Sequence, residues 1–249
     1  MPDTGSHHLR IHSKRQTAFI KIATMQSRKL ATGNELTDDL LQGGFEFDAI
    51  TTIYGPAGAG KTNLALLAAI ETAKAGKKVI FIDTEGGFSV SRLKQLLPEY
   101  KKLLDKIVFL RPTTFEEQKV SIERLKELVN NKIGLIIVDT ITMLYRLQRS
   151  FKEDDTHNQD LSLQMLILNE IARKHNIPVL LISQVYSSFE NRGVKIVGGD
   201  ILNYTSKCML ELENMQNGVR KIILKKHRSI ACPQERQFII IEKGIEKKE

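Results

Sequence analysis

Residues 55–62 form an uninterrupted phosphate-binding motif of the pattern G-x-x-x-x-G-K-T. Its glycines let the backbone curl around a phosphate group with N–H groups pointing inward, and the helix that follows adds partial positive charge there. We expect Lys61 to reach the β- and γ-phosphates of a nucleotide and the hydroxyl of Thr62 to bind Mg²⁺. The motif therefore predicts a protein that binds a nucleoside triphosphate. The predicted binding residues are Gly55, Pro56, Ala57, Gly58, Ala59, Gly60, Lys61, Thr62 and Asn63.

Two acidic side chains follow apolar stretches that are typical of buried strands. Asp139 comes directly after residues 135–138, which is the Walker B arrangement, and a carboxylate there holds Mg²⁺ through water. Glu85 follows the stretch 78–83 and is placed to act as general base for the attacking water. The competing interpretations are an ordinary acid at a strand end for Asp139 and a turn-forming acid for Glu85.

Gln184 follows a third apolar stretch, residues 178–183. Because the carboxyl ends of parallel strands open onto one crevice, its amide is expected to face the same site as the two acids. We interpret Gln184 as a sensor of the γ-phosphate that relays its presence into the segment 186–199. A solvated strand end is the simpler alternative. The predicted catalytic residues are thus Lys61, Glu85 and Gln184.

The order of apolar stretches predicts how these residues are brought together. An apolar strand precedes the phosphate-binding motif and an apolar helix follows it. Continuous apolar strands separated by helices indicate a mostly parallel central sheet with helices on both faces. The predicted strands are 49–54, 78–83, 107–110, 135–139 and 178–183, and the two longest helices between them are 114–131 and 161–175.

The pattern changes after Gly198-Gly199. Residues 207–213, 219–228 and 235–242 are typical of strands, and a turn at Asn217-Gly218 joins the first two. We therefore expect an antiparallel C-terminal extension of the α/β sheet.

Composition limits the class of protein. A chain of 249 residues with 41% hydrophobic residues has enough apolar surface for one sizeable core. No apolar run is long enough for a membrane span, and Cys208 and Cys232, the only cysteines, lack metal-like spacing. Cytoplasmic localisation is therefore expected, with no membrane partner. We expect residues 1–24 to be a flexible basic leader, either native or left from cloning. Residues 25–249 are expected to form the compact core.

The net charge of +8 permits nucleic-acid binding without proving it. Two predicted loops, 146–156 and 186–199, combine basic and aromatic residues, a mixture that suits single-stranded nucleic acid through phosphate contacts and base stacking. Plain polar loops are the alternative. The candidate DNA-binding residues are Arg146, Arg149, Lys152, Tyr186, Arg192 and Lys195.

Residues 31–44, 81–88, 138–146 and 242–246, together with the phosphate-binding motif, resemble the RecA-type recombinase core. More narrowly they resemble the archaeal RadB family, short paralogues of the RadA recombinase, over about residues 28–249. The resemblance implies a RecA-like fold, ATP and Mg²⁺ as cofactors, slow DNA-dependent hydrolysis, and a role in homologous recombination and DNA repair. It also implies that Arg92 stacks on adenine, although Arg92 is equally compatible with a solvated helix position.

The sequence departs from the RadA pattern in three ways. We expect no helical DNA-binding domain ahead of the core, no clear Phe-x-x-Ala polymerisation motif, and a short second loop. These differences favour an accessory or mediator role over that of the main strand-exchange recombinase. The expected partners are DNA, preferably single-stranded, the main recombinase or other repair proteins, and further copies of the chain.

The basic segment 224–229 supports a competing interpretation. Lys226 and Arg228 are placed to act in trans on the γ-phosphate of a neighbouring subunit, and KaiC-like ATPases carry a similar segment at this place. Those proteins usually carry paired glutamates where this chain has Glu85-Gly86. This departure favours the RadB-like interpretation, and a KaiC-like signalling ATPase, or a nucleotide-gated protein-binding module without a DNA role, stays open as the alternative. A solvated basic strand is the simplest alternative for the segment.

Overall fold

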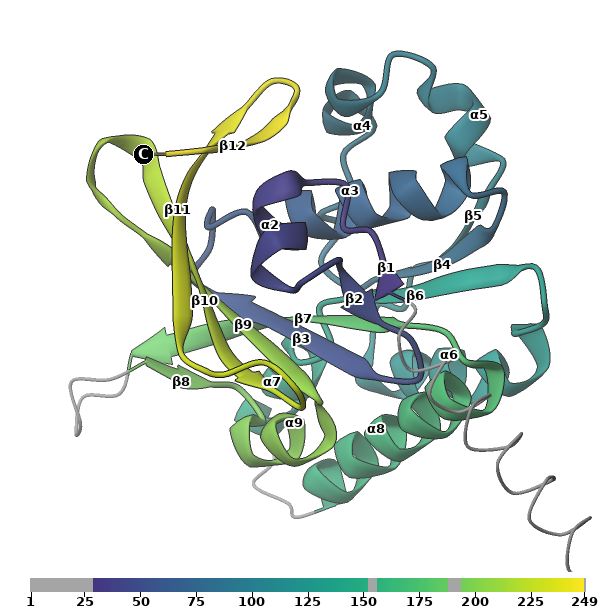
Figure 1. Cartoon of the computed structure of the whole chain (residues 1–249). Coiled ribbons are helices and arrows are strands. Elements are labelled where there is room, and N and C mark those ends of the chain that lie inside the picture. The colour runs from purple at the N-terminus through teal and green to yellow at the C-terminus, as the bar shows by residue number, and fades with distance from the viewer. Residues whose placement is uncertain (1–28, 152–155, 188–193, 249) are drawn as a thin grey trace, which may run out of the picture.

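A ten-stranded mixed sheet forms the centre of the molecule (Figure 1). The computed structural model describes residues 29–151, 156–187 and 194–248. The strands along the sheet run in the order β12-β11-β10-β9-β3-β7-β6-β4-β5, and β8 pairs with β7. The strands are β3 (Ile50–Gly55), β4 (Lys78–Asp83), β5 (Ile107–Leu110), β6 (Ile133–Asp139), β7 (Val179–Ser187), β8 (Val194–Ile196), β9 (Cys208–Asn214), β10 (Val219–His227), β11 (Gln234–Ile241) and β12 (Gly244–Lys247).

The predicted fold class is confirmed, with one shift in the boundary of the antiparallel part. Strands β5, β4, β6, β7, β3 and β9 pair in parallel throughout. The antiparallel extension starts only at β10, because β9 lies parallel to β3. The turn predicted at Asn217-Gly218 is a short 3-10 segment, Gln216–Gly218, with Asn217 in the left-handed region.

Helices cover both faces of this sheet (Figure 1). Alternate strand residues point to opposite faces, so that Phe81 and Ile137 join one core cluster while Ile82 and Val138 join the other. Every residue of β6 is buried, as a strand covered on both faces requires. One face carries α2 (Glu35–Leu40), α3 (Lys61–Lys74), α4 (Val90–Leu96) and α5 (Tyr100–Leu104), and the other carries α6 (Phe115–Leu128), α7 (Met143–Phe151), α8 (Thr156–His175) and α9 (Gly199–Thr205).

Residues ahead of the central strand β3 form a small separate element. Strands β1 (Lys29–Leu30) and β2 (Phe45–Glu46) pair antiparallel around α2. The side chain of Asn34 caps α2 by accepting from Thr37 N at 3.2 Å, and it also donates to the Ile245 carbonyl at 2.8 Å. This contact ties the first element of the described chain to the last strand.

The prediction of a loop at residues 146–156 is wrong for the part of this range that the structure describes. Residues Met143–Phe151 form helix α7, and Arg146 and Arg149 lie on it. The helix forms because Leu144 and Tyr145 are buried, with the Tyr145 ring edge-on to Phe115 at a centroid distance of 5.8 Å. Local sequence does not reveal this packing, since Phe115 belongs to α6.

The predicted loop at 186–199 also differs from the structure. Strand β7 continues to Ser187 and pairs with β8, with Tyr186 opposite Lys195. Both residues therefore belong to a β-hairpin rather than to a loop. The candidate residues Lys152 and Arg192 lie outside the described residues.

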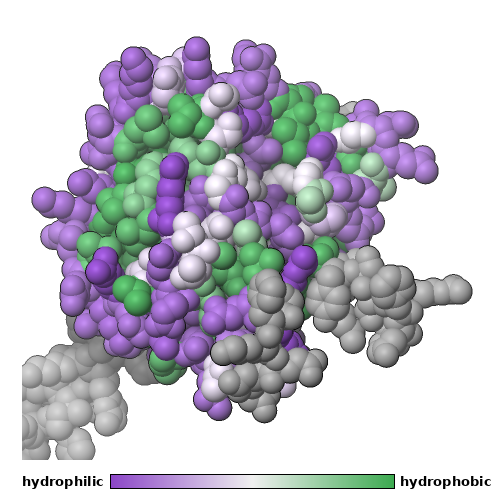
Figure 2. Space-filling model, turned by 180° about the vertical axis from the view of Figure 1, so that it is seen from behind, coloured by the Kyte–Doolittle hydropathy of each residue, from purple (hydrophilic) through white to green (hydrophobic). Residues whose placement is uncertain are grey.

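The surface seen from behind has hydrophilic residues around several apolar patches (Figure 2). Exposed apolar side chains within the described ranges include Leu147, Leu166 and Tyr204. Among the helices that the structure describes, none is both long enough and apolar enough to span a bilayer.

Candidate nucleotide-binding site

The phosphate-binding loop connects the end of β3 to the start of α3, as the motif predicts. A side chain at either of two of its glycines would cause strain, at Gly55 because of close backbone packing and at Gly60 because of its positive φ. A Cβ atom at Gly55 would lie 2.2 Å from the Leu212 carbonyl oxygen, and one at Gly60, where φ is +103°, would lie 3.0 Å from Ile240 Cδ1. The loop is thus enclosed by β9 and β11 as well as by its own strand and helix.

Lys61 is buried at the first position of α3. Its Nζ donates to the carbonyl oxygens of Gly55 at 2.9 Å and Pro56 at 2.8 Å. Burial lowers the pKa of Lys61, while the carboxylates of Asp139 and Glu85 act in the opposite direction. The ammonium group is therefore held over the loop by two neutral carbonyl oxygens. Charged phosphate oxygens of a nucleotide would form stronger hydrogen bonds with it and replace them.

Thr62 and Asp139 meet as the predicted magnesium site requires. The Thr62 hydroxyl donates to Asp139 Oδ2 at 2.7 Å, and Asp139 lies buried at the end of β6. Burial raises the pKa of Asp139 to about 6, against the opposing effect of the Thr62 hydrogen bond. A hydroxyl and a carboxylate are the oxygen ligands that Mg²⁺ prefers, with phosphate oxygens and water completing its shell. The residues present thus fit the ion.

The same burial leads to a prediction for Asp139→Asn. At pH 7 the ionised carboxylate is disfavoured by its surroundings, whereas asparagine is neutral and still accepts from Thr62. We expect the melting temperature of the nucleotide-free variant to be equal to or above that of the parent, and its affinity for ATP with Mg²⁺ to fall by at least about tenfold. Thermal melts and calorimetric titration measure the two effects. The exposed Asp105→Asn is the control, and a nucleotide-free melt lowered by several degrees would contradict the expectation.

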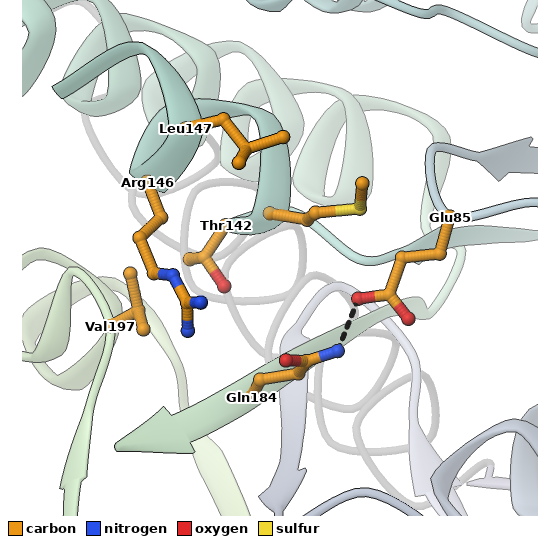
Figure 3. A pocket seen from close by; sticks show the side chains of 7 residues that line it. Glu85, Thr142, Arg146, Leu147, Gln184 and Val197 are labelled. Carbon is orange, nitrogen blue, oxygen red and sulfur yellow. Dashed lines mark hydrogen bonds between the residues drawn. The ribbon is translucent and has the colours of Figure 1, made fainter. Parts of the chain in front are cut away.

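Glu85 and Gln184, distant in sequence, are hydrogen-bonded across the sheet. Gln184 Nε2 donates to Glu85 Oε1 at 2.5 Å (Figure 3). The pairing register places Gln184 opposite Gly55, and it places Asp83, two residues before Glu85, opposite Asp139. The predicted base and the predicted sensor therefore lie together at the carboxyl edge of the sheet.

Asp83 has a different task from Glu85 although both follow β4. Its carboxylate accepts from the backbone N–H groups of Gly87 at 3.0 Å and Phe88 at 3.3 Å. These bonds form the turn that projects the exposed Glu85 into the crevice. The turn-forming acid is therefore Asp83, and Glu85 is left with a carboxylate that faces the site.

A cavity adjoins this pair. It is lined by residues of four segments, namely Glu85, Thr142, Met143, Arg146, Leu147, Gln184 and Val197. Figure 3 shows the Arg146 side chain pointing into the cavity that Glu85 and Gln184 border. One predicted DNA-binding residue therefore shares a cavity wall with the predicted catalytic residues.

Arg92 is engaged differently from the arrangement that the resemblance implies. Its guanidinium donates to the carbonyl oxygens of Ile241 at 2.8 Å and Glu242 at 2.9 Å, and to Asn63 Oδ1 at 2.7 Å. Arg92 thus clamps the turn between β11 and β12 onto the helix that carries the phosphate-binding loop. Adenine stacking by Arg92 stays a prediction, and it competes with this clamp.

Arg92→Ala separates the two roles. Loss of the clamp is expected to lower the melting temperature by about 3–6 °C, which corresponds to ~1.5 kcal/mol of hydrogen bonding. Lys94→Ala, which removes an exposed charge from the same helix, is expected to melt like the parent. An unchanged melting temperature combined with weakened ATP affinity would favour adenine stacking instead.

Lys226 and Arg228 lie far from the phosphate-binding loop of their own chain. The register pairs His227 with Cys208 and Cys208 with Thr51, near the start of β3 rather than at its end. Arg228 forms ion pairs with Glu46 at 2.7 Å and Asp48 at 2.9 Å, and Lys226 donates to the Asn203 carbonyl. Action on a γ-phosphate could come only in trans from this position, and it stays a prediction.

Thr140 is one of the residues of this site that the sequence pattern does not single out. Its hydroxyl donates to Glu85 Oε1 at 3.3 Å, and it follows the Walker B acid directly. Its place next to Asp139 in the sequence is the one feature that points to a role in this site.

The fold and the site together define a RecA-type P-loop nucleotide-binding core. The phosphate-binding loop follows the central strand β3, the candidate metal-binding acid ends β6, the candidate base follows β4, and the candidate sensor lies on β7 next to β3.

Comparison with known proteins identifies the family. The family model described as Rad51 matches residues 24–248. The DNA repair and recombination protein RadB of Methanobrevibacter smithii is 38% identical over 232 residues, which cover 90% of this chain and 98% of that protein. RadB of Methanococcoides burtonii is 39% identical over 210 residues, covering 84% of this chain and 93% of that protein. A solved structure described as the crystal structure of the RadB recombinase superposes with a TM-score of 0.77 at 38% identity, covering 88% of this chain and 100% of that one.

The chain belongs to the Rad51 family and, within it, groups with the RadB proteins, as the resemblance predicted. Proteins of this family are ATPases that bind ATP with Mg²⁺.

Proposed function

We propose that this protein is a slow, DNA-dependent ATPase that acts in homologous recombination and DNA repair, as an accessory factor rather than as the main strand-exchange enzyme. The observation that carries the proposal is the cavity wall shared by Arg146, Glu85 and Gln184. A DNA-facing cation and a nucleotide-facing acid that line one cavity can respond to each other. The curated relatives carry the name DNA repair and recombination protein, which supports the same role.

Each residue of the crevice has a separate task in ATP hydrolysis. Mg²⁺, when bound, neutralises charge that develops on the phosphates. Thr62 and Asp139 would hold the ion, Lys61 would bind the β- and γ-phosphates, and Glu85 would orient the attacking water. The hydrogen bond from Gln184 occupies one oxygen of Glu85, which supports a slow reaction because the base is partly engaged.

The DNA-binding part of the proposal starts from α7. Arg146 and Arg149 are exposed on this helix, and Arg149 Nη1 donates to the Tyr145 hydroxyl at 3.3 Å. Basic side chains in these positions suit a single-stranded phosphate backbone. Tyr186 and Lys195, in the β7–β8 hairpin, together with Lys152 and Arg192, complete the proposed DNA contacts.

The proposal also covers the partners of the protein and its location in the cell. We propose a cytoplasmic protein that contacts the main recombinase or other repair proteins and associates with copies of itself. Residues 25–249 are proposed to act as one unit, with 1–24 as a basic leader. Membership of the Rad51 family and the likeness to RadB proteins support these partners and this location.

The proposal is tested by single-stranded DNA affinity, measured by fluorescence anisotropy across a salt series with ATP, with ADP and without nucleotide. We expect binding that depends on the nucleotide, with a log–log salt slope of about −0.7 per phosphate contact. The Arg146→Ala/Arg149→Ala variant is expected to bind about tenfold more weakly and with a flatter slope.

The exposed Arg124→Ala, on α6, is the matched control for lost positive charge, and it is expected to bind DNA like the parent. Absence of binding at moderate salt would contradict the DNA role. A protein-binding module or a KaiC-like ATPase would then fit better, and closed rings formed with ATP would favour the KaiC-like alternative.

A further inference from the structure

The hydroxyl of Thr140 joins the candidate base to the helix that carries the DNA-facing cations. Thr140 Oγ1 donates to Glu85 Oε1 at 3.3 Å, and it accepts from the backbone N–H of Met143 at 3.2 Å. Met143 is the first residue of α7. A single side chain thus contacts both the nucleotide crevice and the start of α7.

Hydrogen bonds hold both the backbone N–H and the backbone carbonyl of Thr140. Its backbone N–H donates to Thr84 Oγ1 at 2.9 Å, and the same Thr84 hydroxyl donates to the Thr140 carbonyl at 2.8 Å. Thr140 is 1% exposed, and Thr84 N also bonds the Asp139 carbonyl at 2.9 Å. These bonds fix the Thr140 backbone, directly after β6, to Thr84, directly after β4, whereas the Thr140 hydroxyl is bonded to Glu85 and Met143.

The start of α7 depends on this hydroxyl. The first N–H groups of a helix have no partner within the helix, and the Met143 N–H finds one in Thr140 Oγ1. The next turn begins with the bond from Arg146 N to the Thr142 carbonyl at 3.0 Å. Arg146 therefore lies less than one helical turn beyond the residue that Thr140 holds.

A hydroxyl has one proton, and Thr140 directs it to the same Glu85 oxygen that accepts from Gln184. If Glu85 turns toward a water molecule beside the γ-phosphate, both bonds to Oε1 change together. The Gln184 route leads into the β7–β8 hairpin, whereas the Thr140 route leads into α7. The two routes start from one carboxylate oxygen and end on different DNA-facing elements.

We propose that Thr140 is a positioning residue that couples the state of Glu85 to the start of α7 and thereby makes the DNA affinity of Arg146 depend on the bound nucleotide. The inference rests on the proposed function, because it requires a DNA-binding ATPase. It adds the residue through which the two activities communicate.

The test measures one ratio, the single-stranded DNA affinity with a non-hydrolysable ATP analogue divided by that with ADP. Thr140→Val keeps the shape of the side chain and removes the hydroxyl. We expect this variant to reduce the ratio by at least about fivefold, the lower end of typical coupling between sites. Thr140→Ser, which restores the hydroxyl, is expected to restore the ratio.

Thr72→Val is the matched control. Thr72 is as buried as Thr140, and its hydroxyl donates to the Ala68 carbonyl at 2.8 Å within α3, outside the lining of the cavity that Glu85 and Gln184 border. If the loss of any buried threonine hydroxyl lowered the ratio, Thr72→Val would lower it as well. We expect Thr72→Val to keep the parent ratio.

Hydrogen exchange of the parent protein supplies a measurement that does not depend on the folding of any variant. The Met143 amide is expected to exchange at different rates with the ATP analogue and with ADP. Equal rates would overturn the proposal, as would a full ratio in Thr140→Val. A parent ratio of one would overturn the inference alone, whereas absence of DNA binding in both nucleotide states would overturn the proposed function and the inference with it.

Discussion

Replacing Lys61 by alanine is expected to weaken ATP binding by at least about 100-fold and to abolish turnover. The variant loses the cation that contacts the phosphates, and charge-assisted hydrogen bonds of this kind contribute roughly 1.5–3 kcal/mol each. Burial lowers the pKa of Lys61, so its surroundings disfavour the charge that alanine removes, and Asp139 keeps its hydrogen bond from Thr62 in the variant. The nucleotide-free protein is therefore expected to stay folded.

Calorimetric titration with ATP and Mg²⁺ measures the affinity, and thermal melts provide the second measurement. At a ligand concentration 100 times its Kd, binding stabilises the parent by about 2.7 kcal/mol, equivalent to roughly 5–10 °C, and this rise is expected to vanish in Lys61→Ala. Lys74→Ala removes the same charge from the last turn of α3, where Lys74 pairs only with Glu71 in the described chain. Unchanged affinity for ATP in Lys61→Ala would contradict the assignment of residues 55–62 as the phosphate-binding loop.

Glu85→Gln is expected to retain ATP binding and to lose hydrolysis by about 10²–10⁴-fold, the usual contribution of a general base. Glutamine has the same shape, and its carbonyl oxygen can still accept from Gln184 and Thr140. Binding and the local geometry should therefore survive, whereas proton abstraction from water should not. Single-turnover assays with saturating ATP separate the chemical step from binding.

The control for this variant is Glu99→Gln, an isosteric loss of charge at an exposed residue that pairs with Lys102. It is expected to turn over ATP at the parent rate. Preserved hydrolysis in Glu85→Gln would move the role of base to another residue. Asp83 is the weaker candidate, because its carboxylate oxygens already accept from Gly87 and Phe88.

Much of the fold follows from local patterns in the sequence. Strands β4 and β6 could be predicted because strands covered on both faces are apolar throughout. The helix predicted from residue 114 begins there, because Thr114 Oγ1 accepts from Glu117 N at 3.1 Å and caps α6. The carboxylate of Glu117, however, accepts from Thr113 N rather than from Thr114. Such features depend on neighbours within a few residues, so a sequence pattern records them.

The errors arose where distant residues decide the structure. Helix α7 contains basic residues that suggest a loop, yet it forms because Tyr145 packs on Phe115 of another helix. Strand β7 was expected to end at Ser183 and continues to Ser187, because β8 supplies its partner. Neither packing partner is adjacent in the sequence, so local periodicity carried no signal for them.

The sequence by itself predicts phosphate binding, because the motif at 55–62 carries its conformational and chemical requirements within eight consecutive residues. The likeness of other segments to a known family predicted its membership. The partners of individual side chains depended on folding. Arg92 reaches a turn about 150 positions away, and Gln184 meets Glu85 across 99 positions. Contacts at such separations follow from strand order and helix packing, which exist only once the whole sheet has formed.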